Sequence, residues 1–380
     1  MNLVSENYIT NYNKKYKTIE QIKYKIEPYL KNVINNVKYE LLDSYKVDKI
    51  NINFNYDNIS LENYYSIAHE YNKNIDYLRQ NILSYFIPSN ITKNILSKFT
   101  YYKRYKFTYK NRLINLHLFN DKSMFDYRLL TTIISKGFAF LEYSNSKRRD
   151  IEFYYIPTNF KKQFPEKEII GPNNVNSAFT SFNRDGSGNR IVIFRKEEAA
   201  KVFIHELVHF INMDFSFKNQ SQVNKLIVEN FDIDKKDKFI NLFEAYTDSI
   251  AIIYNTIFNS ILLDKSASNL IRDEINYQYK VLCKILKFSN MNHILKNKNK
   301  SKNILKQNSN VLSYYFIKYG LLKNPQIFLN KFDINANWNE NKILEIYNVS
   351  KNILDKTKFK IDSINPNNSL RMTYNNINVI

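Results

Sequence analysis

Two histidines four residues apart carry the clearest chemistry in this sequence. His205, Glu206 and His209 form the pattern HELVH within the apolar stretch KVFIHELVHF. In a helix, side chains four residues apart project from one face, so both imidazoles can reach one metal ion. Glu206 lies beside the first ligand, where its carboxylate can accept a proton from metal-bound water. The pattern therefore predicts one Zn²⁺ per chain, held by His205 and His209, with Glu206 as the general base.

A catalytic zinc needs a third protein ligand and one open coordination position. The apolar stretch FINLFEAYTDSIAIIY, residues 239–254, supplies two carboxylates one helical turn apart, Glu244 and Asp248. Their neighbours leave little room for a solvated helix face, so we expect both carboxylates to point inward. Glu244 is the predicted third ligand. Asp248 is predicted to accept the free ring N–H of a ligating histidine, which fixes the orientation of that ring.

Other sites for the chemistry are less well supported by the sequence. An alternative third ligand would be a His or Asp six residues after the second histidine of HELVH, preceded by a glycine three residues after that histidine. Here these positions hold Phe215 and Asn212, so the sequence does not support this arrangement. Asp214 is out of register for this role and is interpreted as a helix-end residue. His69 has no second histidine four residues later, and His117 belongs to a β-like stretch. The metal site is therefore expected only around HELVH.

The order of elements around HELVH predicts a mixed α+β protein. Strands are expected at residues 49–56, 106–119, 150–155, 175–182 and 190–194, with a glycine turn at 183–189. Helices are expected at residues 17–45, 60–87, 124–143, 196–212, 222–232, 236–262, 267–289 and 309–323. We place a boundary near residue 120. It separates an N-terminal accessory α/β region of unknown role, 1–120, from the part that carries the chemistry, 121–380.

HELVH followed on a later helix by EAYTD resembles the gluzincin metallopeptidases, and within them the thermolysin-like pattern of a Glu ligand with an Asp four residues on. The resemblance covers roughly residues 123–255. It implies a zincin-like fold, with a mixed sheet and the HExxH helix in an upper lobe, 121–212, and a mainly helical lower lobe, 213–380. It also implies a zinc-dependent endopeptidase that binds an extended peptide between the lobes.

The resemblance assigns further roles outside the zinc ligands. It implies an edge strand whose backbone pairs with the substrate. The matching residues are Asn176, Ser177, Ala178 and Phe179. Peptidases of this kind stabilise the oxyanion with a Tyr, His or Arg of the lower lobe. The candidates here are Tyr315, which we prefer, then Arg371, with Tyr314 and His293 also considered.

The amino-acid composition limits which binding partners and which cellular compartment can be expected. The net charge of +20 suggests nucleic acid, but the basic residues are scattered and the richness in Asn, Ile, Lys and Tyr indicates a skewed genome. The single cysteine, Cys283, excludes an internal disulfide. No signal peptide or membrane span is predicted, so we expect an intracellular, non-secreted protein. The composition and the stretch VNSAFTSF…HELVHF are also similar to uncharacterised HExxH proteins of large eukaryotic DNA viruses, which implies host cytoplasm or virion.

Three alternatives remain open from the sequence. The zinc site could belong to a catalytically idle zincin-fold protein with a structural or interaction role, for instance in a virion. The basic surface could make the chain a nucleic-acid-associated protein, with steeply salt-dependent binding to duplex DNA. The same chemistry could also hydrolyse another amide or serve self-cleavage alone. A protein or peptide substrate is the expected partner; the sequence indicates no oligomeric state.

Overall fold

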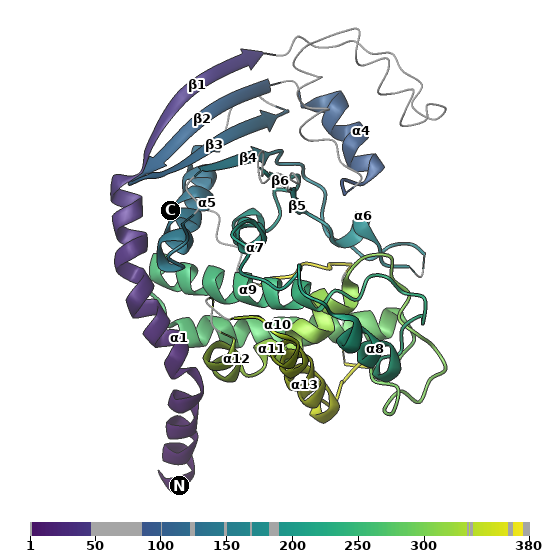
Figure 1. The fold of residues 1–380 in the computed structure, drawn as a ribbon. Coiled ribbons are helices and arrows are strands. Elements are labelled where there is room, and N and C mark those ends of the chain that lie inside the picture. Colours follow the sequence, from purple (N-terminus) through teal and green to yellow (C-terminus); the bar gives the residue numbers. More distant parts are fainter. Residues whose placement is uncertain are drawn as a thin grey trace, which may run out of the picture.

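A mixed sheet with helices packed beneath it forms the described part of the chain (Figure 1). The structure is a computed structural model. It describes residues 2–46, 86–99, 101–121, 126–147, 150–167, 169–181, 190–332, 334, 337–363 and 368–374. The predicted strand 49–56, most of the predicted helix 60–87 and the glycine turn 183–189 lie outside these ranges. The strands lie in the first half of the described chain and only helices follow the last strand, so the predicted mixed α+β class is confirmed.

The sheet has six strands in the order β1-β2-β3-β4-β6-β5. Their bounds are β1 Lys38–Lys46, β2 Tyr101–Tyr109, β3 Arg112–Asn120, β4 Asp150–Tyr155, β5 Ala178–Ser181 and β6 Arg190–Ile193. β1, β2 and β3 are antiparallel, whereas β3, β4 and β6 run parallel. β5 closes the order as an antiparallel edge strand on β6. Strands from both sides of residue 120 therefore share one sheet.

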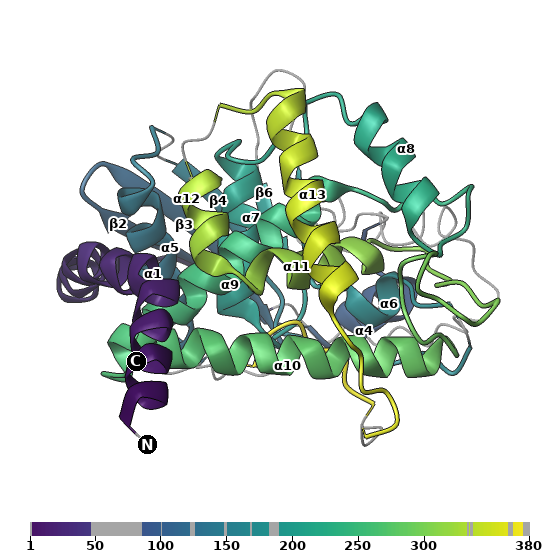
Figure 2. The ribbon, with the colours of Figure 1, turned by 90° about the horizontal axis from the view of Figure 1, so that it is seen from below.

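Most helices lie in successive layers on one face of the sheet. Their bounds are α1 Asn2–Asn36, α4 Ser89–Lys98, α5 Tyr127–Tyr143, α6 Pro172–Val175, α7 Ala199–Phe210, α8 Ser221–Asn230, α9 Leu242–Leu262, α10 Ala267–Phe288, the π-helix η2 Leu312–Ile317, α11 Lys318–Leu322, α12 Pro325–Lys331 and α13 Glu340–Lys356. Helix α4 packs on the opposite face of the sheet in a separate cluster of buried residues. α5 and α7 lie nearest the sheet and α9 lies beneath α7 (Figure 1). α10 and α13 cover the side away from the sheet (Figure 2).

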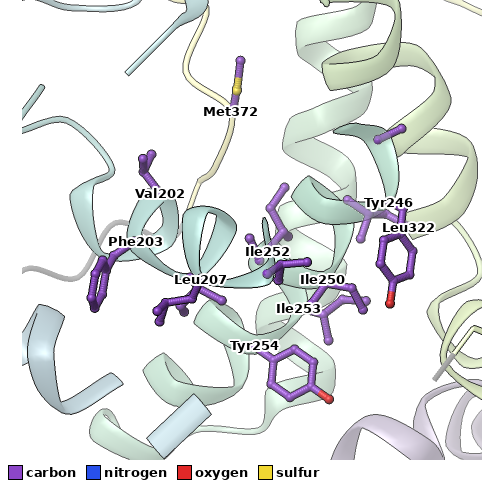
Figure 3. Close-up of a cluster of buried hydrophobic side chains, with 14 of the residues drawn as sticks. Val202, Phe203, Leu207, Tyr246, Ile250, Ile252, Ile253, Tyr254, Leu322 and Met372 are labelled. Carbon is purple, nitrogen blue, oxygen red and sulfur yellow. The ribbon is translucent and has the colours of Figure 1, made fainter. Parts of the chain in front are cut away.

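Helix α7 is the centre of the core. Its Phe203 ring stacks on Phe153 of β4, with the ring centroids 4.4 Å apart. On α5, a Cβ added to Gly137 would lie 2.4 Å from the Phe203 ring, so only glycine lets the two helices approach this closely. Val202, Phe203 and Leu207 of α7 belong to the same hydrophobic cluster as the buried apolar residues of α9 (Figure 3). This packing fixes the rotation of α7 and therefore the direction of its polar face.

Among the sequence-based boundaries that differ from the structure, two change the type or number of elements. The helix expected over residues 17–45 ends at Asn36, and Lys38–Lys46 form strand β1. The apolar residues of this stretch fit three-and-four spacing, but pairing with β2 decides its structure. The single strand expected at 106–119 is a hairpin of β2 and β3, turning where Lys110 has a φ of 52°. The helices in the described ranges include none that is long and apolar enough to cross a bilayer.

Candidate metal centre

Helix α7 holds HELVH in a buried position, as the sequence predicts. Its apolar face points to the sheet and α5, and its other face meets α9. His205 is 7% exposed and Glu206 is 4% exposed. Glu244 lies in the first turn of α9 and Asp248 one turn later. Two packed helices therefore bring together the residues that the sequence singles out.

Three donor atoms converge where α7 faces α9. The Nε2 atoms of His205 and His209 lie 3.2 Å apart. Oε2 of Glu244 lies 3.3 Å from Nε2 of His205 and 3.6 Å from Nε2 of His209. Among the described residues, this is the one group of three or more His, Cys, Asp or Glu side chains close enough to share a metal ion.

The spacing of these atoms fits a tetrahedral zinc ion. Bonds of about 2.0–2.1 Å to nitrogen and oxygen place tetrahedral ligand atoms about 3.3 Å apart. The three observed separations of 3.2, 3.3 and 3.6 Å bracket this value. Two imidazoles and one carboxylate also form a donor set that catalytic zinc sites use. Both the geometry and the chemistry of the three side chains therefore suit Zn²⁺.

Each histidine has a carboxylate on its other ring nitrogen. Nδ1 of His205 lies 3.1 Å from Oδ1 of Asp248, the partner that the sequence predicts. Nδ1 of His209 is hydrogen-bonded to Asp214. An Nδ1–H that donates to a carboxylate leaves Nε2 as the lone-pair nitrogen that can bind a metal. Both rings are therefore oriented with Nε2 toward Glu244.

The bond with Asp214 was missed because Asp214 was interpreted only as a helix-end residue. Helix α7 ends at Phe210, and Asn212 has a φ of 56° in the left-handed region. This turn brings the Asp214 carboxylate back to His209, where Ser216 also donates to it from N–H and Oγ at 2.9 and 2.7 Å. An Asn just after the end of a helix often adopts the left-handed conformation and turns the chain back. Asn212 is therefore the sequence feature that could have indicated that Asp214 returns to His209.

Asp248 is the centre of a buried set of charges. Besides His205, it accepts hydrogen bonds from Lys201 of α7 and from Lys318 of α11, the latter at 2.8 Å. All three charged side chains are at most 2% exposed. Burial acts to raise the pKa of Asp248, but the two lysines hold it well below its ordinary value. Asp248 is therefore a carboxylate at neutral pH, as an acceptor for His205 must be.

Glu206 points to strand β5 instead of joining the three donors. Oγ1 of Thr180 donates to the Glu206 carboxylate at 2.7 Å and to its backbone oxygen at 3.1 Å. Burial raises the pKa of Glu206, and the positive charge of a nearby protonated His205 or His209 opposes this shift. A carboxyl with a raised pKa beside a metal site is suited to proton transfer near neutral pH. Thr180 lies one position beyond the predicted edge residues.

A cleft with a volume of about 630 Å³ opens onto the donor atoms. The predicted edge residues all line it: Asn176, Ser177, Ala178 and Phe179. Two of these residues precede the strand, because β5 spans Ala178–Ser181. His205, Glu206, His209 and Glu244 line the same cleft. The sheet edge and the polar face of α7 therefore border one space.

Tyr314 is the oxyanion candidate that the structure brings to the site. Its hydroxyl donates to Oε2 of Glu244 at 3.2 Å, and it lines the cleft. The preferred candidate, Tyr315, instead donates to the Leu370 carbonyl at 2.6 Å in the core. Successive helical residues point in different directions, so only one of the two tyrosines can face the site.

The other two oxyanion candidates also lie away from the three donor atoms. The Arg371 guanidinium donates to the carbonyls of Thr373 and Tyr374. Nδ1 of His293 accepts the N–H of Leu295. Neither Arg371 nor His293 lines the cleft. Tyr314 is therefore the one oxyanion candidate from the sequence that reaches the donor cluster.

Comparisons with known proteins give one relative. The chain is similar to an uncharacterized protein of Acanthamoeba polyphaga mimivirus, 24% identical over an alignment that covers 52% of this chain and 54% of the relative. It thus spans about half the length of that curated relative. No sequence profile of a protein family and no solved structure matches the chain. The predicted similarity to uncharacterised viral proteins is confirmed to this extent.

Proposed function

We propose that the chain is a zinc-dependent endopeptidase of the gluzincin type, with a zincin-like fold. The observation that carries the proposal is the convergence of His205, His209 and Glu244 at zinc-ligand spacing. A buried Glu206 beside these donors and a cleft bordered by a sheet edge support it. In this proposal His205, His209 and Glu244 hold one Zn²⁺ per chain, while Asp248 and Asp214 orient the histidines.

Bound zinc supplies an acidified water molecule and polarises the carbonyl of the scissile bond. Glu206 acts first as the general base and then as the general acid: its carboxylate accepts the proton of the attacking water and delivers it to the leaving amine. Thr180 holds that carboxylate toward β5, so it does not compete as a metal ligand. The two glutamates therefore differ in role: Oε2 of Glu244 lies 3.3 and 3.6 Å from the two histidine Nε2 atoms, whereas the Glu206 carboxylate accepts a hydrogen bond from Thr180.

Tyr314 is the proposed oxyanion-stabilising group. Burial raises the pKa of its hydroxyl well above the ordinary value, and Glu244 adds to this shift. The hydroxyl therefore stays protonated and can donate a hydrogen bond to a developing negative charge. The tyrosine comes from η2 and lines the same cleft as strand β5 and Glu206. A peptide carbonyl bound in this cleft beside the donor atoms would lie near both Tyr314 and Glu206.

Strand β5 is the proposed binding site for the substrate backbone. It is an edge strand of the described sheet, so its outer edge is placed to pair with an extended peptide. The cleft runs along this edge and past the donor atoms. An extended peptide bound there would place one of its carbonyls beside the metal ligands, which is the geometry that an endopeptidase needs.

The proposal is tested with a mixed-sequence peptide library, because the preferred substrate sequence is not needed to detect cleavage. New amino termini would be counted by mass spectrometry after incubation with the purified protein. We expect cleavage that a zinc chelator abolishes and that added zinc restores. Absence of cleavage by zinc-loaded protein, across libraries of different lengths, would refute endopeptidase activity.

Asp214→Ala should weaken zinc binding by about 10- to 100-fold, because partners of ligating histidines typically contribute this much to metal affinity. The substitution removes the acceptor for Nδ1 of His209 and leaves the three donors in place. Zinc affinity would be measured by competition with a coloured chelator. Asp273→Ala, an exposed position on α10, is the matched control. Equal affinities in the two variants would contradict the role of Asp214.

A further inference from the structure

The C-terminal segment 368–374 lies against the metal centre. It pairs with the loop before α6: the Leu370 N–H donates to the Lys162 carbonyl at 2.8 Å, and the Phe164 N–H donates to the Asn368 carbonyl at 3.0 Å. Met372 of this segment lines the same cleft as Val202 of α7, and both are drawn in Figure 3. Sequence positions that are 170 residues apart (372 − 202) therefore border one site.

The segment enters a buried network of six charged side chains. The members are Lys162, Lys201, Lys318, Glu198, Asp248 and Glu274, each at most 2% exposed. Lys162 pairs with Glu198 at 2.8 Å, and both Lys201 and Lys318 pair with Asp248. Buried charges are stable only when they are paired and hydrogen-bonded. Every partner of this network therefore matters for the position of its neighbours.

Backbone groups of the segment complete the network. The N–H of Thr373 donates to Glu198 at 2.6 Å, while its hydroxyl and the N–H of Tyr374 both donate to Glu274 at 2.8 Å. The Met372 carbonyl accepts hydrogen bonds from Lys318, at 3.5 Å, and from Gln278. Without the segment, two buried carboxylates and one buried ammonium would each lose a partner.

Two of these contacts lead directly to the zinc ligands. Lys318 contacts the Met372 carbonyl and Asp248, and Asp248 orients His205. Glu198 immediately precedes α7 and has a φ of 63°, a left-handed conformation that costs a non-glycine residue about 1 kcal/mol. Lys162 and Thr373 hold its carboxylate. The segment thus supports both the start of the HELVH helix and the carboxylate behind His205.

We propose that residues 368–374 are a positioning element of the metal centre. By completing the buried charge network, the segment holds Asp248 against His205 and fixes the start of α7, and Met372 forms part of the cleft wall. The inference rests on the proposed zinc site. It predicts that zinc affinity depends on a segment that supplies no metal ligand.

The first test compares the zinc affinity of the full chain with two shortened chains by chelator competition. A chain that ends at Tyr374 keeps every contact described above and should bind zinc as the full chain does. A chain that ends at Asn367 lacks the segment and should bind zinc at least about tenfold more weakly. Equal affinity in both shortened chains would overturn the inference. A full chain that binds no zinc would instead overturn the zinc site on which the proposed function depends.

Lys318→Met in the full chain keeps the test decisive if the shorter chain does not fold. The substitution breaks the connection between Met372 and Asp248 while the rest of the segment stays in place. We expect zinc affinity to fall about tenfold, and the visible spectrum of the cobalt-loaded protein to change because the His205 ring is held less firmly. Lys280→Met, exposed on α10, is the control. Unchanged affinity and an unchanged cobalt spectrum in Lys318→Met would overturn the proposal.

Discussion

Replacing Glu206 with Gln should lower peptide hydrolysis by about 10²- to 10⁴-fold while zinc content stays unchanged. Glutamine has the same shape but cannot accept a proton, and Thr180 can still donate to its amide oxygen. The three donors His205, His209 and Glu244 are untouched. The rate of library cleavage and the zinc content of the same preparation would be measured together.

The matched control for this substitution is Glu229→Gln, the same chemical change at an exposed position on α8. Glu229→Gln should cleave the library at the wild-type rate. Hydrolysis at the wild-type rate in Glu206→Gln would remove the general base from the mechanism. Loss of zinc from Glu206→Gln would instead show that Glu206 is a ligand, which contradicts the separation of roles between Glu206 and Glu244.

Replacing Asp248 with Ala should destabilise the protein by about 3–5 kcal/mol at neutral pH, because it leaves two buried ammonium groups without their carboxylate. Lys201 and Lys318 both donate to Asp248 and are at most 2% exposed. Urea unfolding of metal-free protein would measure the difference from wild type. The exposed control Asp273→Ala should change the free energy of unfolding by less than about 0.5 kcal/mol.

The effect of Asp248→Ala should also depend on pH in a defined direction. The pKa of Asp248 lies well below its ordinary value in the folded protein, so its contribution is complete above the unfolded pKa of about 4. As the pH falls below about 4, the unfolded chain takes up a proton that the folded chain does not, and the contribution is progressively lost. The wild-type advantage should therefore shrink in acid. An advantage that is constant from pH 7 to pH 3 would contradict the ionised, paired state of Asp248.

Local spacing explains why much of the site could be predicted from the sequence. His205 and His209 lie on one helix, as do Glu244 and Asp248, so helical periodicity alone fixes which side chains share a face. The strongly apolar neighbours of both pairs indicate buried helices. These two predictions depend on spacing within a single helix. The edge residues 176–179 are placed next to the site by the resemblance to gluzincins and not by a local pattern.

The remaining parts of the site depend on contacts that no local pattern records. Nothing in the sequence distinguishes Lys201 and Lys318 from the many other lysines of the chain. Only the fold shows that both donate hydrogen bonds to Asp248. Choosing between Tyr314 and Tyr315 requires the rotation of η2, which the sequence does not give. The segment 368–374 carries no motif, because its contribution comes mainly from backbone groups. Long-range pairing with β2 likewise decides that Lys38–Lys46 form a strand.

The most direct test of the proposed zinc site is the zinc content of purified protein, measured by mass spectrometry for wild type, His205→Ala and Glu244→Ala. We expect close to one zinc per wild-type chain and a marked loss in both variants, because each substitution removes one of three convergent donors. A wild-type chain that takes up no zinc when zinc is supplied, or variants that keep the full wild-type content, would contradict this site.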